Sequence, residues 1–239
     1  MDVRRFRADL YNLATRACVG DDQEVRLKVF SVADILVNLY RKNLVKINHS
    51  ALELICARSL IKQGYEVKVE HRLDMTLVCD VVGERGDGKI IVEIETGFIP
   101  PEAALEPSAY ARTRIASKIA RYSPFAGKFA LGTTPSYVLE IPEFFVKPPR
   151  ARSMDEAAKI KDMTDVRYNK PPISTMELMQ ARLHLVLLID VDSASTHELD
   201  PETYVKRASE FLGWHKGTLG AGPGPVEDGF NISESAGIS

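Results

Sequence analysis

The stretch LVCDVVGERGDGKIIVEIE, residues 77–95, predicts two neighbouring strands joined by a turn. Residues 77–82 are an apolar run interrupted by one carboxylate, Asp80, which is typical of a largely buried strand. Residues 83–88 are rich in glycine and charge, so the second strand, residues 89–95, is expected to return antiparallel to the first. Because burying an unpaired carboxylate is costly, Asp80 is explained more easily by function than by packing.

The alternation of strand side chains decides how the acids of this hairpin are aimed. Glu93 and Glu95 share one face, about 7 Å apart, and Asp80 on the neighbouring strand can reach the same place. Three crowded carboxylates raise one another's pKa unless a cation lies between them. Mg²⁺, with Mn²⁺ as a substitute, is the natural cation for oxygen ligands and can activate water against a phosphodiester. The alternative is that Glu93 and Glu95 form the solvated face of an edge strand.

Outward from the hairpin, apolar periodicity and turn residues divide the chain into further elements. Helices are predicted within residues 1–46 and over 50–63, 108–122 and 201–212, and strands over 65–69, 128–132 and 183–191. This order favours an α/β fold in which helices flank a mixed sheet. The predicted organisation is an N-terminal helical extension (1–46), an α/β core (47–212) and a flexible tail rich in Gly, Pro and Ser (213–239).

The predicted extension carries an amphipathic stripe that has two interpretations. Asp21 and Asp22 are suited to start a helix just before it. Apolar residues then recur at three- and four-residue spacing: Val25, Val29, Val32, Ile35, Leu36 and Leu39. The stripe packs on the rest of the chain or, alternatively, forms a homodimer contact.

The helix that precedes the hairpin completes a recognisable pattern. The segment ELICA (53–57) lies in a predicted helix that ends at GYEV (64–67). With Asp80 and the Glu-Ile-Glu at 93–95, this arrangement resembles the PD-(D/E)xK, or restriction-endonuclease-like, nuclease superfamily. The transition from helix to Gly-Tyr-x-Val is similar to those of archaeal Holliday-junction resolvases and Mrr-type restriction enzymes. The resemblance covers residues 48–135, with weaker agreement in the order of later elements.

The resemblance implies a restriction-endonuclease-like fold and a homodimeric DNA endonuclease that depends on Mg²⁺. It implies that Asp80 and Glu93 ligate the metal ion and that Glu95 positions or deprotonates the attacking water. It also implies that Lys118 stabilises charge developing on the phosphate and that Glu53 orients a metal-bound water. These roles are expectations that follow from the family pattern.

Two departures from the family pattern bear on activity. No proline precedes Asp80, and Glu95 stands where lysine is usual. The segment SKIARY (117–122) lies where the family often places Gln or Lys facing the site, so Lys118 could supply the missing positive charge. The alternative is a catalytically inactive nuclease-fold protein that acts as a DNA-binding or scaffold subunit.

Other candidate residues also have structural interpretations. Ser50-x-x-Glu53 fits a capping box, in which Glu53 only satisfies a helix N-terminus. Asp190 and Asp192 are a rival acid pair, ranked lower because they lie at a strand end. The five histidines are scattered, and none lies near the hairpin acids in the sequence. The helix at 108–122 presents a basic face that is either solvated or binds DNA phosphates: Arg112, Arg114, Lys118 and Arg121.

Composition limits the function classes. The formal net charge of −2 gives no strong overall field to attract nucleic acid, although binding depends on where cations lie. Cys18, Cys56 and Cys79 show no metal-ligand spacing and are expected to be buried thiols in a reducing cytoplasm. No apolar run approaches the ~20 residues of a membrane span, and nothing indicates an organic cofactor. A further alternative is a protein-interaction module whose N-terminal helices bind a partner.

Overall fold

A computed structural model describes residues 2–212, and the predicted flexible tail, 213–239, lies outside the described residues. The helices are α1 (Val3–Ala17), α2 (Gln23–Arg41), α3 (Ile47–Lys62), α4 (Pro107–Tyr122), α5 (Glu143–Val146), α6 (Met154–Asp165), α7 (Thr175–Gln180) and α8 (Pro201–Leu212). The 3₁₀ helices are η1 (Pro101–Ala103), η2 (Ser123–Phe125) and η3 (Pro149–Ala151). The strands are β1 (Glu66–Arg72), β2 (Val78–Arg85), β3 (Gly88–Glu95), β4 (Lys128–Thr133), β5 (Leu185–Asp190) and β6 (Ser195–Leu199).

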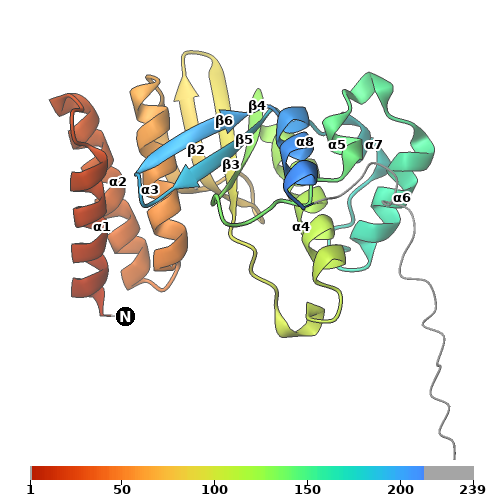
Figure 1. Cartoon of the computed structure of the whole chain (residues 1–239), viewed down its shortest axis with the longest axis horizontal. Coiled ribbons are helices and arrows are strands. Elements are labelled where there is room, and N and C mark those ends of the chain that lie inside the picture. The colour runs from red at the N-terminus through yellow and green to blue at the C-terminus, as the bar shows by residue number, and fades with distance from the viewer. Residues whose placement is uncertain (1, 213–239) are drawn as a thin grey trace, which may run out of the picture.

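The strands form one mixed sheet of six, and their order in space is their order in the sequence, β1-β2-β3-β4-β5-β6. Strands β1, β2 and β3 form an antiparallel meander, β3, β4 and β5 are parallel, and β6 runs antiparallel to β5. Helix α4 makes the crossover that the parallel pair β3 and β4 requires. Helices flank both faces (Figure 1), so the predicted α/β class with a mixed sheet is confirmed.

Alternating strand residues separate two apolar layers. Val81, Val92 and Ile94 pack into the layer beneath α1, α2 and α3. Val82 and Ile91 point the other way, into the layer beneath α4 and the helices that follow it. Figure 1 shows the two groups of helices on either side of the sheet. The hairpin is therefore buried from both sides, which explains its apolar sequence.

The two N-terminal helices belong to the first of these layers. Helix α2 begins after Asp22, whose carboxylate accepts a hydrogen bond from the Val25 N–H, as the sequence predicts. Val29, Val32 and Leu36 of the predicted stripe are buried in the same apolar cluster as α3 and the sheet. Most of the stripe therefore packs within the chain, whereas Ile35 is exposed, and the homodimer stays a prediction.

One strand is missing from the sequence-based assignment. Strand β6 is short and polar and lies at the sheet edge, so it lacks an apolar signal. The rival acid Asp190 closes the turn before β6 by accepting hydrogen bonds from the N–H groups of Asp192 and Ser193. The three cysteines are free and buried, as predicted. No helix in the part of the chain that the structure describes is long and apolar enough to cross a membrane.

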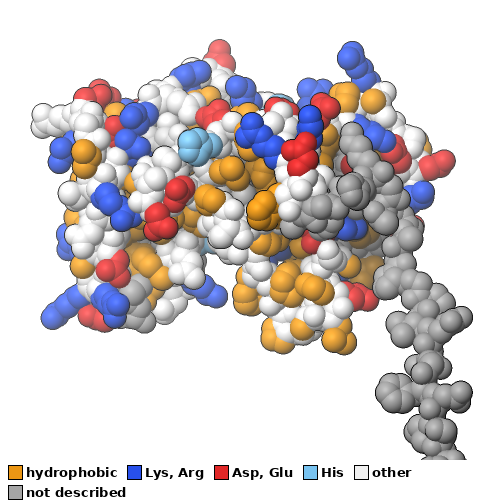
Figure 2. Space-filling view, viewed as in Figure 1, with side chains coloured by type: hydrophobic (Ala, Val, Ile, Leu, Met, Phe, Trp, Pro, Cys, Tyr) orange, Lys and Arg blue, Asp and Glu red, His pale blue; other side chains and the backbone are white. Residues whose placement is uncertain are grey.

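The face of the molecule drawn in Figure 2 has mixed charge and an apolar projection. On the face seen in Figure 2, acidic and basic side chains are interspersed. Hydrophobic side chains gather on the lobe below the sheet, where Figure 1 places the segment between β3 and α4. Phe98 and Leu105 of this segment are exposed. The segment follows Glu95 directly, so it borders the candidate site.

Candidate metal centre

The candidate site lies where strands β2 and β3 separate. Their backbone pairing ends at Val81 and Val92. At the next position the Asp80 N–H donates to Glu93 Oε1 at 3.1 Å, and the Ile94 N–H donates to Asp80 Oδ2 at 2.6 Å. Side-chain carboxylates thus replace the ladder hydrogen bonds, and this fixes both acids in the opening between the strands.

Helix α4 covers one side of this opening and brings two cations to it. Lys118 Nζ lies 2.7 Å from Glu95 Oε1 and 3.1 Å from Glu93 Oε2. The same ammonium lies 3.8 Å from Asp80 Oδ2. Arg114 Nε donates to Glu95 Oε1 at 2.9 Å. We call Glu93, Glu95, Arg114 and Lys118 the α4-side network; with Asp80 it contains the three hairpin acids and the lysine that the sequence singled out.

The α4-side network is electrostatically coupled because it is nearly dry. Glu93 is 2% exposed, and burial together with the Asp80 carboxylate raises the pKa of Glu93 to about 8, against the opposing effect of Lys118. Burial alone would lower the pKa of Lys118, but the surrounding carboxylates outweigh it and raise that pKa. The lysine therefore stays charged and neutralises the acids beside it.

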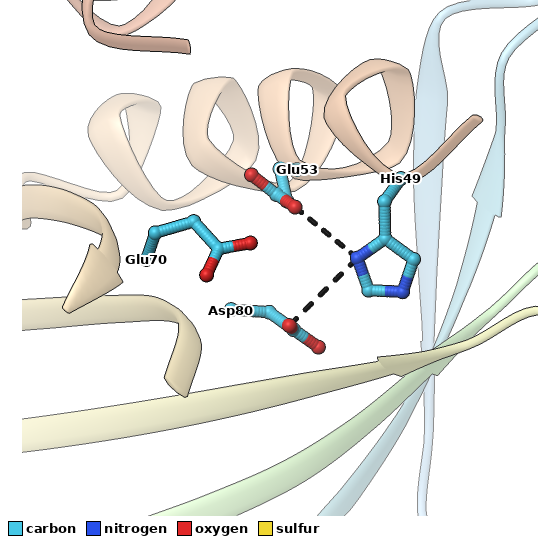
Figure 3. Close-up of side chains that lie close together, drawn as sticks. All are labelled: His49, Glu53, Glu70 and Asp80. Carbon is cyan, nitrogen blue, oxygen red and sulfur yellow. Dashed lines mark hydrogen bonds and ion pairs between the residues drawn. The ribbon is translucent and has the colours of Figure 1, made fainter. Parts of the chain in front are cut away.

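A second group of side chains meets on the α3 side of the opening (Figure 3). His49 and Glu53 come from α3, Glu70 from β1 and Asp80 from β2. His49 Nδ1 lies 3.1 Å from Glu53 Oε1 and 3.7 Å from Asp80 Oδ1. One potential ligand atom from each of the four side chains lies within 4.8 Å of the others. These four residues, the α3-side cluster, could hold a metal ion.

The geometry of α3 explains why His49 and Glu53 are neighbours. The helix begins at Ile47 after the N-cap Lys46, and residues four apart lie on the same face. Glu53 is in the second turn, fully buried, and it contacts His49. The capping-box interpretation of Ser50 and Glu53 is therefore wrong, because the helix starts one turn earlier than the sequence indicated.

Glu70 lies in strand β1 and has a left-handed backbone conformation. Its φ is +47°, in the left-handed region that costs a residue other than glycine roughly 1–2 kcal/mol. Val69 packs in the apolar layer beneath α3, and Glu70 joins the cluster on the same side of the sheet. A regular strand would have sent consecutive side chains to opposite faces. Such strained positions cluster at functional sites, where the surrounding structure keeps the residue in its unfavourable conformation.

The three carboxylates of the α3-side cluster carry more negative charge than the neighbouring cationic groups neutralise. Burial, followed by the carboxylates of Glu53 and Asp80, raises the pKa of Glu70 to about 7. Burial raises the pKa of Glu53 as well, although His49 opposes the shift. The pKa of His49 rises to about 9 because Glu53 and Asp80 outweigh its burial. Glu53 Oε2 is buried without a hydrogen-bond partner. A cation bound among these groups would relieve all of these effects.

The basic residues of α4 have internal partners. Arg112 Nε donates to Glu140 Oε2 at 2.9 Å, and Arg121 Nη2 donates to the carbonyls of Tyr168 and Pro171 at 3.2 and 2.6 Å. Arg114 and Lys118 are held in the α4-side network. The predicted DNA contacts of these four residues stay a prediction, and each side chain would have to exchange or share its present partner.

The sequence-based search missed His49 and Glu70. His49-x-x-x-Glu53 has the spacing that places an imidazole and a carboxylate on one helix face, so this signal was present in the sequence. Glu70 gave no such signal, because the predicted strand ended at residue 69 and the left-handed backbone has no glycine to mark it.

Comparison with known proteins adds no further assignment: no protein-family model, no curated protein and no solved structure matches the chain. The site is therefore interpreted from its own residues.

Proposed function

We propose that this chain is a divalent-metal-dependent nuclease that hydrolyses DNA phosphodiester bonds, with Mg²⁺ or Mn²⁺ as its cofactor and DNA as its substrate. The observation that carries the proposal is the buried group of acids around Asp80, which is deficient in positive charge and lies beside a charged lysine. Metal-assisted hydrolysis requires such a centre, because the ion polarises the phosphate and activates water.

The order of elements supports a restriction-endonuclease-like core for residues 47–212. Helix α3, the meander β1-β2-β3, the crossover helix α4 and the parallel strand β4 follow one another. Their acids lie at the positions that the PD-(D/E)xK resemblance names, with Glu53 on the first helix, Asp80 on β2 and Glu93 on β3. The order of these elements and the meeting of their acids around Asp80 support the proposal.

The residues of the chain would divide the work as follows. Asp80 and Glu53 are available to hold a divalent ion, with His49 and Glu70 beside them. Lys118 would donate to the phosphate oxygen on which negative charge develops. Glu95, 2.7 Å from Lys118, would orient that ammonium and position the attacking water.

A second candidate is the inactive relative, a DNA-binding or scaffold subunit. The observation in its favour is Lys118 itself, which bridges all three hairpin acids, while Glu95 occupies the position of the usual lysine. In this alternative the lysine is a permanent internal counter-ion and the fold retains only its surface functions.

The test is cleavage of duplex, single-stranded, flap and junction DNA in Mg²⁺ or Mn²⁺. Asp80→Asn and Glu95→Gln are the site variants, and Asp192→Asn, at an exposed position in the turn after β5, is the matched control. We expect the wild type and the control to cut and both site variants to lose at least about 100-fold of the rate. Cleavage that both site variants retain would overturn the proposed site.

Failure of the wild type on every substrate would reject the nuclease proposal. DNA binding that weakens steeply with salt would then identify the inactive DNA-binding subunit, since release of counterions from phosphates causes that dependence. Absence of DNA binding at low salt would instead favour a scaffold or protein-interaction role.

A further inference from the structure

We propose that the metal ion of this protein binds in the α3-side cluster, on His49, Glu53, Glu70 and Asp80, and that Glu93 is not a ligand. We further infer that this site takes a first-row transition ion, represented by Mn²⁺, in preference to Mg²⁺. The inference rests on the proposed function only in the role that it gives the ion in catalysis. The position and the identity of the ion can be tested without DNA.

The distribution of charge separates the two sides of the opening. In the α4-side network two carboxylates, Glu93 and Glu95, contact two cations, Lys118 and Arg114, so the formal charges cancel. The α3-side cluster holds three carboxylates and one imidazole. Among the described residues its salt bridges are those of His49 and the longer contact of Asp80 with Lys118. A divalent cation would therefore find uncompensated carboxylates on the α3 side, whereas the carboxylates of the α4 side already have counter-ions.

The carboxylate of Asp80 is oriented for this division. Its Oδ2 accepts the Ile94 N–H at 2.6 Å and faces Lys118, so this oxygen is committed to the α4 side. Its Oδ1 faces His49 at 3.7 Å. Asp80 can thus give one oxygen to an ion on the α3 side without losing the hydrogen bond that fixes it. Glu93 is bound by Lys118 and by the Asp80 N–H, so both of its oxygens are already in use.

A second, independent observation points to an absent ligand. Glu53 is fully buried, and its Oε2 has no hydrogen-bond partner. Buried carboxylate oxygens are almost always paired, because leaving one unpaired costs free energy that the fold must supply elsewhere. The other oxygen of Glu53 contacts His49. Figure 3 shows the side chains of the cluster converging from α3, β1 and β2. Within the protein, the Glu53 carboxyl can share a proton with the neighbouring acid Glu70, and a metal ion would take the place of that proton.

The donor set decides the kind of ion. Mg²⁺ keeps most of its water and is usually held by one or two carboxylates, not by an all-protein cage. The α3-side cluster offers three carboxylates and one imidazole nitrogen, and nitrogen donors favour first-row transition ions over Mg²⁺. Four protein ligands leave positions of an octahedral ion open for water or a phosphate oxygen. Mn²⁺ suits this mixed set because it accepts carboxylates and octahedral geometry.

The experiment is titration of metal-stripped protein with MnCl₂ and MgCl₂ by calorimetry, with Mn²⁺ electron paramagnetic resonance as a second readout. Glu53→Gln and His49→Asn are the ligand variants, and Glu93→Gln tests the acid on the other side of the opening. Asp192→Asn, at an exposed position in the turn after β5, is the control. Circular dichroism establishes that each variant is folded. His49 is partly exposed, so His49→Asn keeps the test valid if the buried substitution at Glu53 prevents folding.

We expect the wild type to bind Mn²⁺ at least about tenfold more tightly than Mg²⁺. We expect each ligand variant to weaken Mn²⁺ binding at least about tenfold. We expect Glu93→Gln and the control Asp192→Asn each to change it by less than about threefold. Equal affinity for both ions, or a loss in Glu93→Gln as large as that in His49→Asn, would overturn the inference. Tight Mn²⁺ binding by a protein that cuts no DNA would reject the proposed function and leave this metal site established.

Discussion

Lys118→Met removes the ammonium that neutralises the acids of the α4-side network while keeping an unbranched apolar stem of similar length up to Cε. Lys118 contacts Glu93 and Glu95, whose side chains are 2% and 4% exposed, so the remaining carboxylates would be buried without it. Breaking a buried ion pair by removing one partner costs about 3–5 kcal/mol. Because Arg114 still pairs with Glu95, the loss falls mainly on Glu93 and is expected near the lower value.

A loss of about 3 kcal/mol corresponds to a fall in Tm of roughly 6–12 °C for a chain of this size. The free energy of unfolding is measured by urea denaturation in EDTA, so that no metal ion replaces the lysine, and near pH 9, above the pKa of about 8 of Glu93, so that this carboxylate is charged in the wild type. The matched control is Lys68→Met, whose ion pair with Glu84 is about half exposed and is expected to contribute at most about 1 kcal/mol.

The double variant Lys118→Met/Glu93→Gln isolates the interaction. If the cost of Lys118→Met comes from an unpaired Glu93 charge, removing that charge recovers most of the stability, and the two substitutions are non-additive by about 2 kcal/mol. The reasoning would be refuted if the free energy of unfolding of Lys118→Met lay within about 1 kcal/mol of the wild-type value, as is expected for the Lys68→Met control. Additivity of the two substitutions would refute it equally.

Two further substitutions test the surroundings of the site by urea denaturation. Gly97→Ala places a Cβ 2.5 Å from the Tyr137 ring, at a φ of +79°. It should lower the free energy of unfolding by about 1–3 kcal/mol more than the control Gly20→Ala, because Gly20 has a similar φ of +81° but no neighbour within 4 Å. Equal losses of stability in the two variants would mean that the Tyr137 ring moves away freely. Asp21→Asn breaks the buried bidentate pair between Asp21 and Arg58 and should lower the free energy of unfolding by about 3 kcal/mol. A loss below about 1 kcal/mol would show that this pair does not anchor the N-terminal helices to α3.

The elements of the fold were predictable where the local pattern is strong. Apolar periodicity located α3, α4 and the strands of the hairpin, and Gly86 with Asp87 marks the turn between β2 and β3. The parallel placement of β4 and β5 is a long-range pairing, and the sequence gives no local signal for it. Strand β6 escaped because polar residues at a sheet edge resemble a loop.

The candidate site was predictable in part for a physical reason. Alternation along two adjacent strands was enough to bring Asp80 near Glu93, whereas Lys118 was singled out through the resemblance to the nuclease pattern and not by helix periodicity. The contribution of Glu70 depends on one left-handed residue inside a strand, and that of His49 depends on how α3 crosses the sheet. The spacing of His49 and Glu53 was visible in the sequence, but the meeting of that helix face with Glu70 and Asp80 could be found only in three dimensions.

Asp80 connects the α4-side network with the α3-side cluster, and this explains why one acid lies within an apolar stretch of β2. Its backbone N–H and Oδ2 bind partners of β3, while Oδ1 faces the α3-side cluster, so the opening of the sheet and the orientation of the carboxylate depend on each other. A strand paired normally at this position would close the opening and turn Asp80 away from His49. The apolar neighbours of Asp80 hold the strand in place, and the interrupted ladder gives the carboxylate the freedom to serve both sides.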